Sequence, residues 1–130
     1  MKKLIIGFTL ALFVTVSVTA QNSLPSNFFM KKLANGMEVL VIEDKTVPLA
    51  TIEIVVRNGS YTEDSVFNGL SHMYEHMFFK ANKDLPSQEA FLKRINELGI
   101  VFNGTTGDER VNYFITLTNN KIDEGIAFMN

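Results

Sequence analysis

The sequence contains no cysteine. Disulfide bonds, thiolate metal ligands and a thiol nucleophile are therefore excluded. Basic runs are also absent after Lys2 and Lys3: without residues 1–20, 10 Lys and Arg stand against 14 Asp and Glu, a net charge of −4. We therefore expect no nucleic-acid partner, because binding to phosphates needs clustered positive charge. No internal repeat or low-complexity segment is present.

Residues 1–20 have the three-part layout of a secretory signal peptide. Lys2 and Lys3 form a charged start, residues 4–14 are apolar, and Val18-Thr19-Ala20 is a small-residue end. The alternative is an uncleaved membrane anchor, but residues 4–20 are short against the span of about 20 residues that a bilayer needs. We expect cleavage after Ala20, no stable membrane span afterwards, and an exported protein that is periplasmic or secreted.

The rest of the chain predicts a short linker over residues 21–27 and one small domain over residues 28–130. An Asn35-Gly36 pair between two apolar runs favours a β-hairpin over residues 28–42, and the β-branched run 49–57 favours a strand. Residues 61–67 are expected to form a loop, with at most one turn of helix. A helix over residues 87–98 has Ser87 as its N-cap and Gly99 after its end.

Residues 100–103 and 111–118 predict two further strands, with a polar turn over residues 104–109. Asn119 or Asn120 is a candidate cap for a last helix. The resulting order predicts an α+β fold, with a largely antiparallel sheet and helices packed on one face.

The segment 68–79 contains both histidines of the chain, four residues apart. In a helix, His72, Glu75, His76 and Phe79 share one side, and the other side is apolar. A helix that is apolar nearly all round is expected inside a protein, where two imidazoles and a carboxylate need partners. A metal ion would satisfy all three.

Histidines at positions i and i+4 can each give one nitrogen to a single zinc ion. Glu75 lies beside them, and its carboxylate can take a proton from water that zinc activates for attack on a peptide carbonyl. The order His-x-x-Glu-His is the inverse of the His-Glu-x-x-His motif. The alternative is that both are ordinary histidines with hydrogen-bonded partners, but the glutamate between them favours Zn²⁺.

The segment 68–80 resembles the active-site segment of the pitrilysin and insulinase family of zinc peptidases, which includes the mitochondrial processing peptidase. The stretches 33–40 and 103–113 are similar to the opening hairpin and to a later strand pair of the same family. The resemblance runs from about residue 28 to residue 130, and it implies the first part of a metallopeptidase half-domain.

The resemblance implies a zinc-dependent metalloendopeptidase with His72 and His76 as metal ligands and Glu75 as the general base. It also implies a third ligand, a glutamate on a later helix beyond Asn130, and a second homologous half-domain or chain that closes the site around a peptide or unfolded polypeptide. We therefore expect the 130 residues to be an N-terminal fragment, inactive alone. The alternative is a noncatalytic peptide-binding subunit or module of the same fold.

Three further features have two readings each. The segment Val101–Thr106 is either an exposed sheet edge that binds an extended peptide or an ordinary strand. Glu109 and Arg110 either orient the site or form a surface ion pair, and the surface pair is favoured. The aromatic residues Tyr74, Phe78 and Phe79 are either a substrate pocket or core, and we expect them in the core.

Overall fold

The computed structural model describes residues 24–130, so the expected signal peptide and residues 21–23 of the expected linker lie outside the described part. The chain divides into two compact units, with the boundary after Asp44. In the first unit, β1 (Phe28–Lys32) pairs antiparallel with β2 (Glu38–Ile42). Asn35 Oδ1 accepts the N–H of Met37, and Gly36 has a φ of 89°, which favours glycine. The expected hairpin is confirmed.

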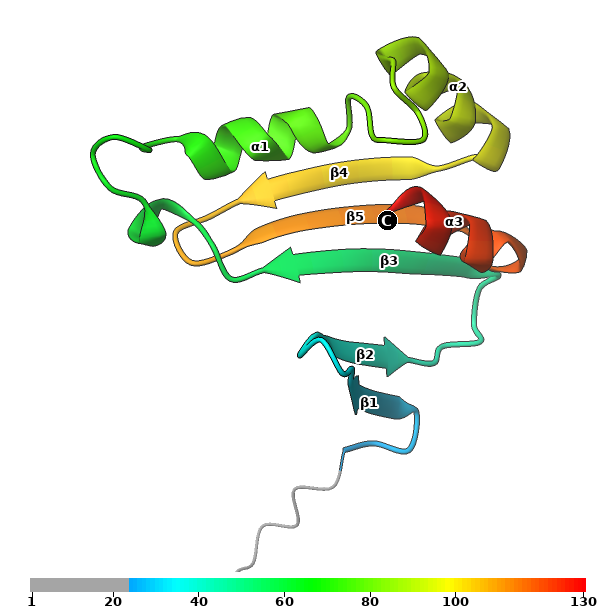
Figure 1. Ribbon diagram of the computed structural model, residues 1–130. Coiled ribbons are helices and arrows are strands. Elements are labelled where there is room, and N and C mark those ends of the chain that lie inside the picture. The colour runs from blue at the N-terminus through cyan, green and yellow to red at the C-terminus, as the bar shows by residue number, and fades with distance from the viewer. Residues whose placement is uncertain (1–23) are drawn as a thin grey trace, which may run out of the picture. The chain divides into compact units, whose positions relative to one another are not determined.

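The second unit is built on a three-stranded antiparallel sheet in the order β3-β5-β4 (Figure 1). The strands are β3 (Leu49–Val56), β4 (Val101–Thr106) and β5 (Val111–Thr118). In the central strand β5, residues 111, 113, 115 and 117 are buried and the residues between them are less so, because successive side chains point to opposite faces. One face of the sheet therefore forms the core.

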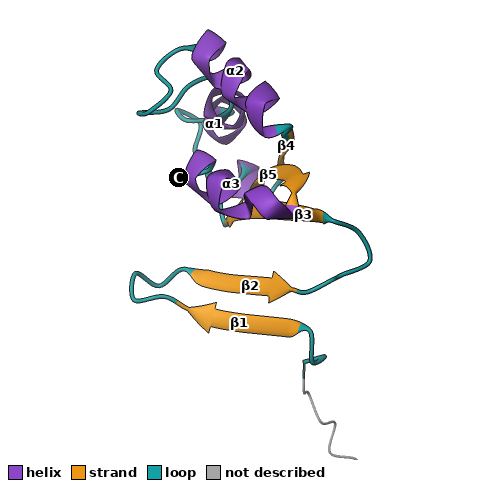
Figure 2. Cartoon of the chain, turned by 90° about the vertical axis from the view of Figure 1, so that its right-hand side faces the viewer, coloured by secondary structure: helices purple, strands orange, loops and turns teal. Residues whose placement is uncertain are grey.

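Three helices lie on this buried face: α1 (Leu70–Phe78), α2 (Gln88–Leu98) and α3 (Ile122–Phe128) (Figure 2). Helix α1 packs on β4 and β5, and α3 packs on β5 and β3. Helix α2 begins at Ser87, whose side chain accepts the N–H of Ala90, and ends at Gly99, whose φ is 67°. Both predicted caps are confirmed, as is the α+β fold with an antiparallel sheet.

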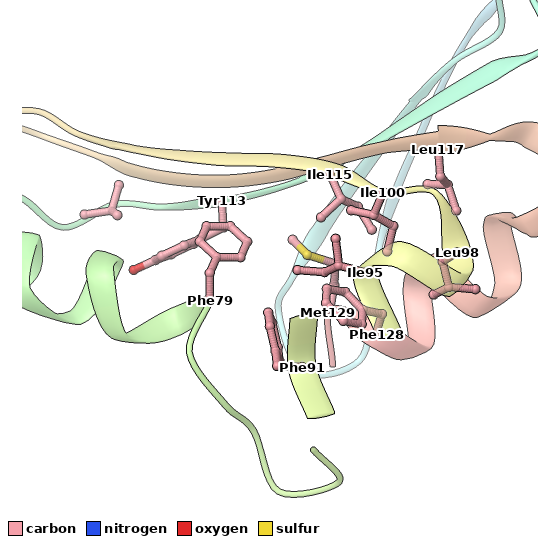
Figure 3. Packing of buried hydrophobic residues seen from close by; sticks show 11 residues of the cluster. Phe79, Phe91, Ile95, Leu98, Ile100, Tyr113, Ile115, Leu117, Phe128 and Met129 are labelled. Atoms are coloured by element: carbon pink, nitrogen blue, oxygen red, sulfur yellow. The ribbon is translucent and has the colours of Figure 1, made fainter. Parts of the chain in front are cut away.

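The core lies between the helices and the sheet (Figure 3). Its buried members lie in a helix, within two residues after a helix, or on β5. They are Phe79, Phe91, Ile95, Leu98, Ile100, Val111, Tyr113, Ile115, Leu117, Phe128 and Met129. Phe91 and Phe128 bring α2 and α3 together, with ring centroids 4.7 Å apart. Within residues 24–130, no helix is both long enough and apolar enough to cross a membrane.

Two expected boundaries are wrong. The polar turn expected over residues 104–109 begins later, because β4 continues to Thr106, which pairs with Val111. The last helix is not capped by Asn119 or Asn120: both lie in a 3-10 turn, η2 (Asn119–Lys121), and α3 follows it without a side-chain cap. At the first boundary, pairing with β5 outweighs the local preference for a turn.

Candidate active site

Helix α1 carries both histidines, and its start is fixed by the loop before it. This loop contains the 3-10 turn η1 (Ser60–Thr62), which agrees with the single turn of helix expected there. The carboxylate of Glu63 accepts hydrogen bonds from the backbone N–H groups of Gly69 and Ser71, each at 2.7 Å. The first N–H groups of a helix have no partner inside it and carry partial positive charge, so the carboxylate caps α1.

The same interactions change the acidity of Glu63. The Ser71 hydroxyl, followed by the backbone N–H groups of Ser71 and Gly69, holds the pKa of Glu63 below its usual value. Asn58 adds to the cluster, because its side-chain amide donates to Ser71 Oγ at 2.8 Å. Ser71, the residue immediately before His72, is therefore held by both Glu63 and Asn58.

The capping loop is itself attached to the turn between β4 and β5. Ser60 Oγ donates to Asp108 Oδ1 at 2.7 Å, and the N–H of Tyr61 donates to the Asp108 carbonyl at 2.9 Å. A Cβ atom on Gly59 would lie 2.3 Å from the carbonyl oxygen of Gly107, so only glycine allows this approach. These contacts join the start of α1 to the far end of β4.

The expectation that α1 lies inside the protein is wrong for these residues. Ser71 is the buried residue of the helix, and the His72 side chain is 63% exposed. On the outer face, Met73, Tyr74 and Met77 are exposed as well. Because only the side of α1 that faces β4 and β5 is covered, burial of the imidazoles cannot be the reason for a metal, and the geometry of the pair has to be considered alone.

The two imidazoles point to the same place. His72 Nε2 and His76 Nε2 are 3.1 Å apart, with ring centroids separated by 4.7 Å. Two nitrogens on one tetrahedral zinc ion, each at about 2.0–2.1 Å, would be about 3.4 Å apart. The pair therefore fits zinc with a very small adjustment. The same separation of the two Nε2 atoms also fits the alternative, a hydrogen bond between the two rings.

Glu75 projects toward the sheet edge and is the less exposed member of the motif, with a side chain 13% exposed. Its Oε2 atom lies 4.0 Å from His72 Nε2 and accepts a hydrogen bond from Thr106 Oγ1 at 3.0 Å. A Cβ atom on Gly104 would lie 2.9 Å from Glu75 Oε1, so the glycine makes room for the carboxylate on β4. The carboxylate is thus beside the histidine nitrogens but held by a strand.

Within residues 24–130, no third His, Cys, Asp or Glu side chain joins the histidine pair to form a metal site. Asp123 and Glu124 lie in the first turn of α3, on another part of the sheet. Glu75 is the nearest carboxylate, and its distance from His72 suits a proton acceptor better than a metal ligand. The described residues bring two imidazoles and one carboxylate together.

An aromatic cluster fastens α1 to the sheet. The Tyr113 ring, on β5, stacks on Phe78 with centroids 4.1 Å apart and also contacts Tyr74 and Phe79. Figure 3 shows Tyr113 and Phe79 side by side between the end of α1 and the sheet. Burial, and then the nearby Tyr74 and Glu75, raise the pKa of the Tyr113 hydroxyl.

The structure also places the aromatic residues, the strand segment and the charged pair considered in the sequence analysis. Phe79 is core and Phe78 is partly buried against it, but Tyr74 is 60% exposed, so its expected place in the core is wrong. Strand β4 pairs only with β5 among the described residues, which makes it a sheet edge. Glu109 and Arg110 are exposed in the turn after it, and no ion pair joins them within the described part of the chain.

Sequence reasoning did not foresee the contacts of three residues: Glu63, Tyr113, and Thr106, which it considered only as the end of the segment Val101–Thr106. Thr106 is 31 positions from Glu75, and Glu63 caps a helix across a loop, so spacing on one helix contains no signal for either. The alternation of apolar residues in 111–118 is a local signal that Tyr113 shares a face with Val111, Ile115 and Leu117. That signal does not identify the histidine helix as the element that packs on this face.

Comparisons with known proteins agree with the geometry. The chain is 31% identical over 128 residues to a zinc protease, PqqE, of Helicobacter pylori, covering 95% of this chain and 28% of that protein. It is 30% identical over 95 residues to an insulin-degrading enzyme homolog of Dictyostelium discoideum, covering 73% of this chain and 10% of that one. The chain therefore spans only about a tenth to a quarter of the length of these relatives.

The fold has a solved counterpart. A crystal structure of a protease from Helicobacter pylori superimposes with a TM-score of 0.72 and 28% identity, over 78% of this chain and 24% of that one. The sequence model of the insulinase family (peptidase family M16) matches residues 38–130, which include both histidines, Glu75 and Thr106. The chain belongs to the insulinase family of peptidases.

Proposed function

We propose that this chain is the N-terminal part of a zinc-dependent endopeptidase in which His72 and His76 hold the metal and Glu75 is the general base. The observation that supports this most strongly is the convergence of the two Nε2 atoms, 3.1 Å apart, with Glu75 Oε2 at 4.0 Å from one of them. The choice of zinc as the metal is supported by relatives that are named as zinc proteases. When bound, zinc would polarise the peptide carbonyl and lower the pKa of the attacking water.

The role of Glu75 follows from its chemistry and position. An ionised carboxylate has about four lone-pair sites on its two oxygens, so the bond from Thr106 leaves acceptor capacity for water. Glu75 takes a proton as the oxygen of water bonds to the carbonyl carbon, and it gives that proton to the amine as the C–N bond breaks. The atoms balance with water as the only co-reactant.

The edge strand β4 suits a peptide substrate. Its outer edge is free of any other strand of the described chain, and Glu75 is bound at its Thr106 end. An extended peptide that added to this edge would be held by main-chain hydrogen bonds beside the base. The same observation favours the second candidate function, a peptide-binding subunit of this fold without turnover.

The test uses the full-length protein with Glu75→Gln. Removing a general base lowers the rate by about 10²–10⁴-fold, so cleavage of an unfolded polypeptide should be lost at that scale while zinc content stays at the wild-type value. His72→Ala should lose both zinc and cleavage. Glu109→Gln, a change of the same kind at an exposed turn, is the control.

Unchanged cleavage in Glu75→Gln would refute the proposed base. If the wild-type protein binds peptide but holds little zinc and cleaves nothing, the peptide-binding subunit is the correct function instead. We propose that the third ligand is a glutamate beyond residue 130. We also propose that a second homologous half-domain or chain completes the site. Replacing that glutamate should remove zinc as His72→Ala does.

We also propose that the protein is exported, to the periplasm or outside the cell. The support is the sequence of residues 1–20 alone. N-terminal sequencing of the protein purified from its host should begin at Gln21. A mature protein that still begins at Met1 in the cytoplasm would contradict export.

A further inference from the structure

We infer that Thr106 is a positioning residue for the reaction, acting by holding the Glu75 carboxylate in its working orientation. The inference rests on the proposed function of Glu75 as the base, and it adds a residue that neither the motif nor the spacing of the histidines indicates. It is carried by one contact, Thr106 Oγ1 donating to Glu75 Oε2 at 3.0 Å, and by how that contact is built.

The Glu75 side chain needs such a partner. Glutamate has three rotatable bonds, and fixing a long side chain costs conformational entropy unless a contact offsets it. The helix fixes only where Glu75 begins, since its periodicity places the Cβ atom and leaves the carboxylate to its surroundings. Within residues 24–130, the Glu75 carboxylate accepts a hydrogen bond from one side chain, Thr106. This bond fixes the position of Oε2.

Thr106 is well placed for this role. It is the last residue of β4, and pairing with Val111 of β5 fixes its backbone. Its side chain lies on the half-buried face of the strand, together with Gly104, where the carboxylate enters. A threonine hydroxyl on a paired strand has little freedom, because a β-branched side chain is restricted at its first torsion.

The position of the hydrogen bond is also specific. It is made to Oε2, the oxygen that lies 4.0 Å from His72 Nε2, and therefore on the side where the metal and the attacking water belong. Losing the bond leaves Glu75 charged and present but free to turn away. A catalytic group displaced by about 1 Å can lose about 100-fold in rate, so a partly disordered base should lose about tenfold.

The kinetic test compares three variants of the full-length, zinc-loaded protein. Thr106→Val removes the hydroxyl with almost no change of shape, and Thr106→Ser keeps a hydroxyl. Thr118→Val makes the same change at an exposed position on β5, outside the proposed peptide-binding strand. We expect kcat to fall about tenfold in Thr106→Val with KM within about twofold, and Thr106→Ser and Thr118→Val to stay near wild type. Thr106→Ala carries the same expectation if the valine variant does not fold.

A second measurement does not depend on activity. In the metal-free protein with ¹³C-labelled glutamate carboxyl groups, the Glu75 signal is the one that disappears in Glu75→Gln. At fixed pH that signal should move in Thr106→Val and keep its wild-type position in Thr106→Ser and Thr118→Val. Zinc content should be the same in all of them, because Thr106 bonds to Glu75 and not to either histidine.

The outcomes separate this inference from the proposed function. If Glu75→Gln abolishes cleavage but Thr106→Val has wild-type kcat or an unmoved Glu75 signal, Thr106 does not position the base and the proposed function stands. Equal losses in Thr106→Val and Thr118→Val would also overturn the inference, since they would indicate a general effect on the sheet. If Glu75→Gln cleaves normally, the proposed base is wrong and the inference falls with it.

Discussion

Tyr113→Ala should detach helix α1 from the sheet and lower the protection of its backbone amides. Tyr113 is 3% exposed, and its ring contacts three aromatic side chains of the helix end: Tyr74, Phe78 and Phe79. No other residue of β5 makes a ring contact with α1 in the described chain. The histidine helix therefore depends on one side chain of the central strand for most of its aromatic packing.

The magnitude follows from the change in burial. Truncating a buried aromatic side chain to alanine costs about 3–5 kcal/mol, because the transfer free energy is lost and a cavity remains. Tyr113→Phe should cost less than about 1 kcal/mol, since the ring stays and the hydroxyl makes no hydrogen bond to another residue of 24–130. The two variants separate the ring from the hydroxyl.

Amide hydrogen exchange of the full-length protein, measured over residues 70–78, is the assay. Ile115→Ala is the matched control, because Ile115 is on the same face of the same strand, is 0% exposed and carries no ring. It should cost about 2–5 kcal/mol overall. If the α1 amides lose no more protection in Tyr113→Ala than in Ile115→Ala, the ring does not hold the helix and the reasoning fails.

Two further predictions concern the loop before α1. Because hydrogen bonds lower the pKa of Glu63 in the folded protein, its contribution to stability is complete above the usual value of 4.5 and is lost as the pH falls through the lower folded value. Acid unfolding of Glu63→Gln should lack that part of the pH dependence; identical acid curves would contradict the cap. Gly59→Ala should destabilise by about 1–3 kcal/mol in thermal or urea unfolding, because its Cβ would overlap backbone atoms of the β4–β5 turn. Gly107→Ala is the control, since its Cβ would lie at an ordinary 3.7 Å from its nearest neighbour, and equal effects would refute the steric argument.

Local patterns predicted the local structure of this chain. The Asn35-Gly36 hairpin, the Ser87 and Gly99 ends of α2 and the convergence of His72 and His76 all depend on residues within a few positions of one another. Turn chemistry, helix capping and the helical period act over that range. The fold class followed from the order of these elements.

Long-range contacts were not predictable in the same way. Residues 104–106 were expected in a turn because of their composition, but pairing with β5 makes them part of a strand. The apolar composition of residues 70–78 indicates a buried helix, yet burial depends on what else surrounds the helix, and α1 is covered on its sheet side only. The sequence of a helix does not show which other parts of the protein pack against each of its faces.

The three contacts that hold α1 come from three different segments: Glu63 from the loop after β3, Thr106 from β4 and Tyr113 from β5. The distance between the two histidines is set inside the helix and needs none of them. The position of Glu75 relative to the β4 edge needs all three. Zinc binding should therefore tolerate the loss of any one contact better than peptide cleavage does, because both proposed metal ligands of the described chain lie on the helix itself. The proposed reaction also requires the Glu75 carboxylate at its place beside β4.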